Sequence, residues 1–274
     1  MSLFTCPVCG AALTRTTKSY DCPAGHRFDL ASDGYVNLLT ANQKHAKEPG
    51  DDKNMVRARS RFLSGGYYDP LLRALETLAV ELPEARPVLL DSGCGEGYYT
   101  QGLYTALCQV GKQPLAAGID ISKEAVRLAA KRLRDGTFAV ASAYRLPLAD
   151  GCADLVLNCF SPLGILEFRR ILKQNGHFFY VVPAPRHLWE LKRAVYDKPY
   201  ENEKILAEYE GFTLEKSVSV QSRIVLSEKQ AISDLFTMTP YFWKTPRSGL
   251  ERLEALEVLE TEIAFDVYVY RKMN

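Results

Sequence analysis

A glycine-rich turn between a short apolar run and a helical pattern is the feature that most restricts the fold of this 274-residue chain. The apolar run Val88–Leu90 is followed by Asp91, and glycines then occupy every second position from Gly93 to Gly97. Glycines suit such a turn because they tolerate left-handed backbone angles and let a ligand approach the main chain. The pattern predicts a strand, a tight turn and a helix whose N-terminus presents free N–H groups to a ligand.

The spacing of the glycines indicates which kind of ligand to expect. Dinucleotide-binding turns read G-x-G-x-x-G, whereas this turn reads G-x-G-x-G. The set Asp91, Gly93, Gly95 and Gly97 resembles the first motif of class I S-adenosylmethionine (SAM) methyltransferases, in which the turn wraps the methionine part of the cofactor. An ordinary strand–helix turn can also carry glycines, but three in alternation after an acid favour SAM, and the spacing argues against an NAD-dependent oxidoreductase.

A second acid ends the next apolar run. Residues 115–119 are apolar, Asp120 follows them, and Ser122 is placed to cap a helix that carries Val126 on its apolar face. An acid roughly 20 residues after the turn is placed to accept both ribose hydroxyls. NAD and SAM proteins share this device, so only the glycine turn and Asp120 together favour SAM.

Near the N-terminus, three cysteines and a histidine form two knuckles. Cys6 and Cys9 have C-x2-C spacing, and Cys22 and His26 have C-x3-H spacing. Three thiolates and one imidazole make a closed tetrahedral zinc site, which is the structural kind because no exchangeable position is left. We expect the metal to supply the folding energy of a module too small to hold a core. Free thiols that cluster by chance are the less favoured alternative.

Composition places the chain among ordinary globular proteins, with 47% hydrophobic and 24% charged residues. Seven scattered cysteines, an odd number, favour a reducing cytoplasm over a disulfide scaffold. No apolar run approaches the length of a membrane span and no signal peptide is evident, so we expect a cytoplasmic protein without a membrane partner. The net charge of +1 gives no argument for nucleic-acid binding and none against a local basic face.

Apolar runs that alternate with amphipathic patterns predict an α/β fold with a doubly wound, mostly parallel sheet of seven strands. The expected strands are 88–90, 115–119, 137–141, 154–159, 177–182, 212–220 and 262–271. In the zinc module, residues 13–20 and 27–30 are expected to form a hairpin, and residues 40–52 a linker. Ser227 is expected to cap a late helix.

Ligands of doubly wound sheets bind outside the carboxyl ends of the strands. That edge would gather the glycine turn, Asp120, the loop with Asn158, Phe160 and Ser161, and the turn with His187. A helix-cap or core role is the alternative for His187. The edge is therefore the expected cofactor and substrate site.

A basic stripe precedes the sheet. Lys53, Arg57 and Arg61 are spaced by four residues and so lie on one face of a predicted helix. Such a stripe is more often a solvated face than a phosphate contact, but the neighbouring zinc module favours a phosphate contact.

The order of motifs along nearly the full chain resembles the bacterial 23S rRNA (guanine-N1)-methyltransferases of the RlmA family. These motifs are the two knuckles, Phe28-Asp29 with Gly34-Tyr35-Val36-Asn37-Leu38, the glycine turn, Pro185-Arg186-His187-Leu188 and Met238-Thr239-Pro240.

This resemblance implies a class I methyltransferase fold and methyl transfer to N1 of a guanine in a 23S rRNA hairpin. It implies that the four knuckle residues hold zinc in an RNA-recognition module, and that Tyr68, Gly95, Glu96 and His187 contact SAM. A partly buried structural tyrosine is the alternative for Tyr68. The expected divisions are a zinc-binding RNA-recognition module, a linker with helices, and a methyltransferase domain, at residues 1–36, 37–85 and 86–274.

Guanine N1 carries a proton at neutral pH, so a general base is expected, yet the loop after the fourth strand holds no carboxylate. Asn158 and Ser161 are candidates to orient the guanine, and neither is assigned as the base. A paired guanine would have to be unstacked. The aromatic candidates to stack on it are Phe160, Tyr241, Phe242 and Trp243.

Two other functions stay open. A SAM-dependent methyltransferase of a small molecule is compatible with the glycine turn, although a small substrate needs no zinc module. A zinc-module nucleic-acid-binding protein with an inactive methyltransferase domain is compatible with the knuckles, although the intact acids and glycines argue against decay. A homodimer would widen the surface offered to a folded RNA.

Overall fold

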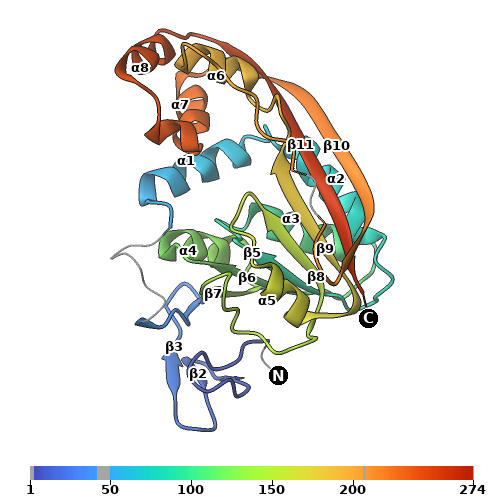
Figure 1. Cartoon of the computed structure of the whole chain (residues 1–274). Coiled ribbons are helices and arrows are strands. Elements are labelled where there is room, and N and C mark those ends of the chain that lie inside the picture. The colour runs from blue at the N-terminus through green and yellow to red at the C-terminus, as the bar shows by residue number, and fades with distance from the viewer. Residues whose placement is uncertain (1–2, 42–49, 206–207, 274) are drawn as a thin grey trace.

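The computed structural model describes residues 3–41, 50–205 and 208–273 and contains one large sheet and one small one (Figure 1). The strands of the large sheet are β4 (Val36–Asn37), β5 (Val88–Ser92), β6 (Leu115–Asp120), β7 (Thr137–Val140), β8 (Ala153–Cys159), β9 (Leu172–Pro183), β10 (Phe212–Leu226) and β11 (Leu259–Lys272). Their order is β10-β11-β9-β8-β5-β6-β7-β4.

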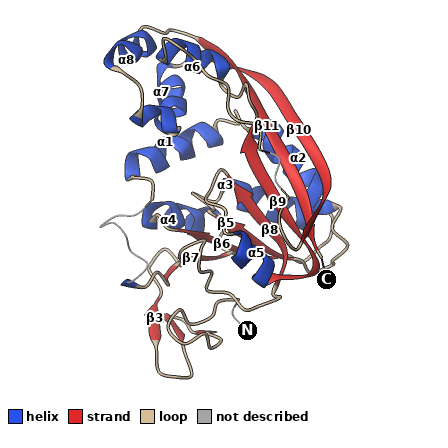
Figure 2. Cartoon of the chain, in the orientation of Figure 1, coloured by secondary structure: helices blue, strands red, loops and turns tan. Residues whose placement is uncertain are grey.

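Helices cover both faces of this sheet, and several gather beyond one end of its strands (Figure 2). They are α1 (Lys53–Ser64), α2 (Asp69–Val80), α3 (Tyr98–Gln109), α4 (Lys123–Arg132), α5 (Ile165–Ile171), α6 (Trp189–Val195), α7 (Lys229–Thr237), η2 (Pro240–Trp243) and α8 (Arg247–Glu254). Among the described residues, no helix has the length and apolar character that a membrane crossing requires.

The topology confirms the predicted doubly wound fold. β5 pairs in parallel with β6 and β8, while β11 runs antiparallel between β9 and β10. All residues of β5 and β8 are buried, because helices pack on both faces of the central parallel strands. This burial explains the apolar runs 88–90 and 155–157 within these two strands.

The sheet has eight strands instead of the expected seven. The additional strand, β4, pairs in parallel with β7 through Val36 opposite Ala139. A two-residue strand is too short to show a periodic pattern, and its pairing depends on a distant partner. The predicted boundary between residues 36 and 37 falls inside β4, and the division into three parts stays a prediction.

Other expected elements differ from those in the structure. The expected strand 13–20 breaks into β1 (Thr14–Arg15) and β2 (Ser19–Asp21), because the Thr16 hydroxyl accepts from the Ser19 N–H and closes a turn. β3 (Arg27–Asp29) completes this three-stranded sheet. Ser227 is not the cap of α7, since Glu228 occupies that position without a side-chain bond. Most of the expected linker, residues 42–49, lies outside the described residues.

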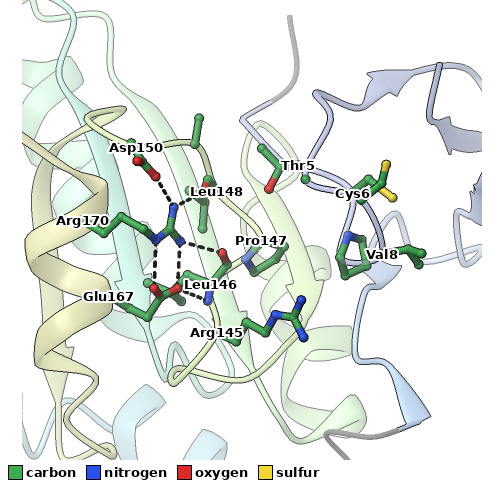
Figure 3. Close-up of a pocket in the computed structure, with 14 residues that line it drawn as sticks. Thr5, Cys6, Val8, Arg145, Leu146, Pro147, Leu148, Asp150, Glu167 and Arg170 are labelled. Carbon is green, nitrogen blue, oxygen red and sulfur yellow. Dashed lines mark hydrogen bonds and ion pairs between the residues drawn. The ribbon is translucent and has the colours of Figure 1, made fainter. Parts of the chain in front are cut away.

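The N-terminal module is docked on the loop between β7 and β8. Thr5 N–H donates to the Pro147 carbonyl at 2.8 Å, and Phe4 forms a bridge with Leu148. Phe4 and Tyr20 are buried in the same apolar cluster as residues of the large sheet. A groove of about 690 Å³ separates the first knuckle from this loop (Figure 3).

Arg170 of α5 holds that loop in place (Figure 3). Its guanidinium donates to the carbonyls of Leu146 and Leu148 at 2.9 and 2.7 Å. It also pairs with Glu167, whose carboxylate accepts from the Leu146 N–H at 2.6 Å. One side chain therefore satisfies two carbonyls of the loop on which the N-terminal module rests.

We predict that Arg170→Met lowers the free energy of unfolding in urea by roughly 2 to 3 kcal/mol, because carbonyls of the loop lose their donors. Arg169→Met is the matched control, since within the described part of the chain the neighbouring Arg169 forms an ion pair only with the highly exposed Glu210, at 3.3 Å. That control should change stability by less than about 0.5 kcal/mol. Equal effects of the two substitutions would contradict the assigned role of Arg170.

Candidate functional site

The four knuckle residues converge in the N-terminal module. Their ligand atoms lie within 4.8 Å of one another. Cys6 Sγ is 3.5 Å from His26 Nδ1, and Cys9 Sγ is 3.4 Å from Cys22 Sγ. A tetrahedral site with metal–ligand distances of about 2.0 to 2.3 Å places ligand atoms roughly 3.5 to 3.8 Å apart. The donor set and its geometry therefore fit a closed zinc site.

The glycine turn is packed closely at its two ends and open in the middle. A Cβ on Gly93 would lie 2.2 Å from the Ser161 Cβ, and one on Gly97 would lie 3.0 Å from the Ala129 backbone. Gly95 has a φ of +53° and would meet no described atom within 4 Å. The turn therefore needs glycine for packing at its ends, while at Gly95 its backbone faces open space that a ligand can approach.

Asp120 fixes the turn from the adjacent strand end. Its two carboxylate oxygens accept from Gly95 N–H at 3.0 Å and from Ser122 N–H at 2.8 Å. Burial raises the pKa of this carboxyl, although both N–H donors favour its ionised form. The carboxylate is therefore held in one orientation beside the open face of the turn.

Buried polar atoms without partners cluster under the turn. Among the described residues, Asp91 Oδ1, Ser92 Oγ and Asn158 Oδ1 have no hydrogen-bond partner. The other Asp91 oxygen accepts from Thr100 Oγ1 at 2.6 Å, and burial raises the pKa of Asp91 to about 7. Orphaned acceptors of this kind fit a ligand with positive charge and N–H donors, which SAM provides through its ammonium group.

Glu96 is buried and paired. Its carboxylate lies 3.3 Å from the guanidinium of Arg132, which also donates to Ser64 Oγ at 3.2 Å. Burial raises the pKa of Glu96, and the two arginines Arg132 and Arg59 oppose that shift. Glu96 thus connects the glycine turn to the end of α1.

Tyr68 and His187 are far apart in the sequence, but their side chains form a hydrogen bond. The Tyr68 hydroxyl is 3.3 Å from His187 Nε2, while His187 Nδ1 accepts from Ala264 N–H at 3.2 Å. Burial lowers the pKa of His187 to about 3, so the ring is neutral at physiological pH. Because Nδ1 is an acceptor, the proton is on Nε2, which donates to Tyr68. The Tyr68 proton is therefore free to point toward another acceptor.

Asn158 and Ser161 hold the loop after β8. Asn158 Nδ2 lies 2.6 Å from Ser161 Oγ and 3.1 Å from the Pro162 carbonyl, and Ser161 Oγ donates to the Ser92 carbonyl at 2.5 Å. These bonds position the loop against the glycine turn. The role of either side chain toward a substrate stays a prediction.

The predicted stacking residues differ in exposure. Tyr241 is buried against Tyr196 and Lys192, whose ammonium lies 5.5 Å from the Tyr241 ring centroid. Phe242 and Trp243 are 39% and 67% exposed. Phe160 is 46% exposed, and its ring centroid lies 5.5 Å from that of Phe265, which also contacts Tyr68 and His187. Phe160, Phe242 and Trp243 are thus available to a substrate, whereas Tyr241 is part of the core.

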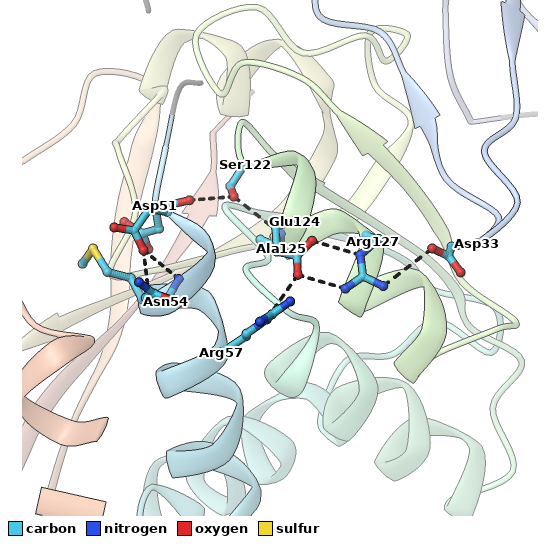
Figure 4. A network of polar contacts seen from close by, with 10 residues as sticks. Asp33, Asp51, Asn54, Arg57, Ser122, Glu124, Ala125 and Arg127 are labelled. Atoms are coloured by element: carbon cyan, nitrogen blue, oxygen red, sulfur yellow. Dashed lines mark hydrogen bonds and ion pairs between the residues drawn. The ribbon is translucent and has the colours of Figure 1, made fainter. Parts of the chain in front are cut away.

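The basic stripe on α1 is largely engaged within the protein. Arg61 forms a bidentate ion pair with the buried Asp234 of α7, at 2.6 and 2.9 Å. Arg57 lies 3.7 Å from Glu124 of α4, in a network that extends through Arg127 to Asp33 of the N-terminal region (Figure 4). The described residues give Lys53 no ion pair. An RNA contact by this stripe stays a prediction.

Arg59 of α1 is a charged residue that no motif of the sequence predicts to be functional. Its side chain is 27% exposed and pairs with Asp51 at 2.5 Å. It lies four residues after Met55 and three before Phe62, so it is on the buried face of the helix and not on the stripe. The sequence does contain one indication of its role, because an arginine stands at a position where the helical pattern predicts an apolar side chain.

Two protein families match parts of the chain. The family described as "Methyltransferase domain" matches residues 84–236, and the family described as "RlmA, N-terminal", a zinc ribbon, matches residues 4–47. The first match contains the glycine turn and Asp120, and the second contains all four knuckle residues. Both predicted modules are therefore confirmed at the level of family.

Relatives extend the similarity to the full chain. YxjB of Bacillus subtilis (strain 168), provisionally assigned as a 23S rRNA (guanine-N(1)-)-methyltransferase, is 35% identical over 99% of this chain and 98% of its own. The 23S rRNA (guanine(748)-N(1))-methyltransferase of Streptomyces fradiae is 36% identical over 69% of this chain and 66% of its own. A protein of Micromonospora griseorubida, with the same provisional assignment as YxjB, is 38% identical over 68% of this chain and 67% of its own.

The raised pKa of Asp91 predicts that ionisation of this residue destabilises the ligand-free folded protein. Its pKa rises from an ordinary 3.8 to about 7 on folding, so its contribution to stability is present below pH 3.8 and is lost as pH rises through about 7. Asp91→Asn should therefore gain stability relative to wild type between pH 4 and pH 8, by up to about 4 kcal/mol. Urea unfolding at several pH values measures this difference.

Asp135→Asn is the control, because Asp135 is exposed on the surface. This substitution should not reproduce the gain in stability expected of Asp91→Asn. A difference for Asp91→Asn that does not change between pH 4 and pH 8 would contradict the burial of an acid with a raised pKa.

Proposed function

This chain belongs to the family of 23S rRNA (guanine-N(1)-)-methyltransferases, and we propose that it transfers a methyl group from SAM to N1 of a guanine in a 23S rRNA hairpin. The observation that carries the proposal is the presence of a zinc-ribbon cluster and a SAM-type glycine turn in one chain, with the ribbon docked on the loop after β7. A small-molecule methyltransferase would have no use for the ribbon.

The cofactor would lie against the open face of the turn. The bound cofactor supplies an electrophilic methyl group. Gly95 leaves room for it, and Asp120 presents oriented carboxylate oxygens of the kind that accept ribose hydroxyls. Asp91 supplies an unpaired oxygen for a positive group. Tyr68, with its proton free to donate, and Glu96 are further proposed cofactor residues, and the expected cofactor contacts of Gly93, Gly97 and His187 stay predictions.

His187 would position Tyr68 and would not serve as the general base. Its Nδ1 lone pair already accepts from Ala264 N–H, and its Nε2 carries the proton given to Tyr68. A ring whose pKa is lowered to about 3 is also a weak base for a guanine N–H. The chain would promote transfer mainly by holding the guanine in line with the methyl group.

The RNA would be held by both parts of the chain. We propose that Cys6, Cys9, Cys22 and His26 bind a structural zinc that shapes the ribbon for hairpin recognition. Phe160, exposed at the edge of the sheet, is placed to stack on an extruded guanine. The Phe160 backbone has a left-handed φ of 54°, a strained conformation of the kind that concentrates at functional sites.

Transfer of labelled methyl from SAM to unmodified 23S rRNA tests the proposal, with 16S rRNA and tRNA as controls. We expect label in 23S rRNA alone and a primer-extension stop at one hairpin guanine, since N1 methylation blocks base pairing. Gly95→Arg should abolish transfer, because its side chain would fill the space beside the turn. SAM binding without label in any of the RNAs would favour a small-molecule substrate.

Removal of zinc distinguishes the role of the ribbon from that of the methyltransferase domain. Chelation, or Cys22→Ser, should release the metal, lower rRNA affinity at least tenfold and leave SAM affinity within about twofold, because the metal ligands all lie in the ribbon and none of the proposed cofactor residues does. Metal analysis and binding titrations measure the two effects. Cys108→Ser, at an exposed cysteine outside the cluster, is the control. Equal loss of SAM and rRNA binding would contradict the separation.

A further inference from the structure

We propose that Arg59 binds the methionine carboxylate of the cofactor, a role that rests on the proposed use of SAM. Nothing in the motifs of the sequence marks this residue. The inference comes from the position of α1, from the unused donors of Arg59, and from the charges around the glycine turn.

Polar contacts near both ends of α1 connect it to the residues that flank the glycine turn. Just before the helix, the Asp51 carbonyl accepts from Ser122 Oγ at 3.0 Å, two residues after Asp120 (Figure 4). At its C-terminal end, Ser64 Oγ accepts from Arg132, which pairs with Glu96. The helix therefore runs from the acid of β6 to the acid within the turn.

Arg59 lies in the middle of that span and on the inward face. The neighbouring Arg57 and Arg61 have side chains that are 58% and 53% exposed, against 27% for Arg59. Arg59 is close enough to Asp120 and Glu96 to oppose the rise in pKa of both carboxyls. Its guanidinium is therefore directed toward the cofactor side of the helix.

The guanidinium has donors to spare. Arginine carries five N–H donors, and two of them form a fork that matches a carboxylate. Among the described residues, the only ion-pair or hydrogen-bond partner of the Arg59 side chain is Asp51, with a terminal nitrogen of Arg59 at 2.5 Å from a carboxylate oxygen. Arg132 lies near the same acids, but its guanidinium is already shared between Glu96 and Ser64. Of these two arginines, Arg59 is therefore the one with N–H donors left for a ligand.

The charge pattern of SAM requires such a cation. Its sulfonium and ammonium groups suit the acids Asp91 and Glu96 at the turn, while Asp120 is the proposed acceptor for its ribose hydroxyls. Its carboxylate would be repelled by the same acids unless a positive group were placed beside them. A partly buried arginine with an open fork supplies that group, and it would restrict binding to cofactors that retain the amino-acid carboxylate.

The test compares two ligands that differ only in this carboxylate, SAM and decarboxylated SAM, by isothermal titration. Arg59→Gln should weaken SAM binding by roughly 10- to 100-fold, because a charge-assisted hydrogen-bonded pair is lost. Binding of decarboxylated SAM should change by less than about threefold, which also shows that the variant is folded. Arg57→Gln, two residues away on the exposed face, should change neither affinity.

Arg59→Lys keeps the charge without the fork and provides a second measurement. It should fall between wild type and Arg59→Gln for SAM alone. Equal weakening of both ligands by both variants would overturn the proposal in favour of a structural role. Unchanged SAM affinity with weaker rRNA binding would overturn it in favour of a phosphate contact. Failure of the wild type to bind SAM would instead contradict the proposed function.

Discussion

The functional end of this protein depends on a small group of hydrogen bonds that join the ends of two adjacent strands. The Ile119 carbonyl, near the end of β6, accepts from the N–H groups of Gly93 and Cys94 as they leave β5. Asp120, the next residue, accepts from Gly95 N–H. These bonds determine at once the path of the glycine turn, the direction of α3 and the orientation of the acid. Every proposed cofactor contact is defined relative to them.

The titratable groups near these hydrogen bonds fall into two kinds: one has a protonation state that is fixed, and the other has a protonation state that responds to a bound ligand. His187 is held neutral by burial and by the N–H that occupies its Nδ1, so it orients Tyr68 at any physiological pH. Asp91, with a pKa of about 7, is instead sensitive to any cation placed beside it. Arg59 contributes the opposite charge from a helix outside the parallel strands.

The parts of the site that could be predicted from sequence are those encoded in local spacing. The glycine turn, Asp120 and the two knuckles each occupy a short stretch, and their chemistry requires particular residues at particular intervals. Arg59 and β4 could not be found in this way, because β4 pairs with the distant β7 and the role of Arg59 depends on how α1 lies relative to Glu96 and Asp120. The burial of Tyr241 was hidden for the same reason, since its neighbours Tyr196 and Lys192 come from another helix and its flank.

The N-terminal module is attached to the methyltransferase sheet at two places. Thr5 bonds to the loop after β7, and Asp33 lies 3.2 Å from Lys131 of α4 before the chain enters β4. A module attached near both of its ends cannot rotate freely relative to the sheet. The distance between the ribbon and the glycine turn is then fixed, and a substrate held by both parts would have to span it.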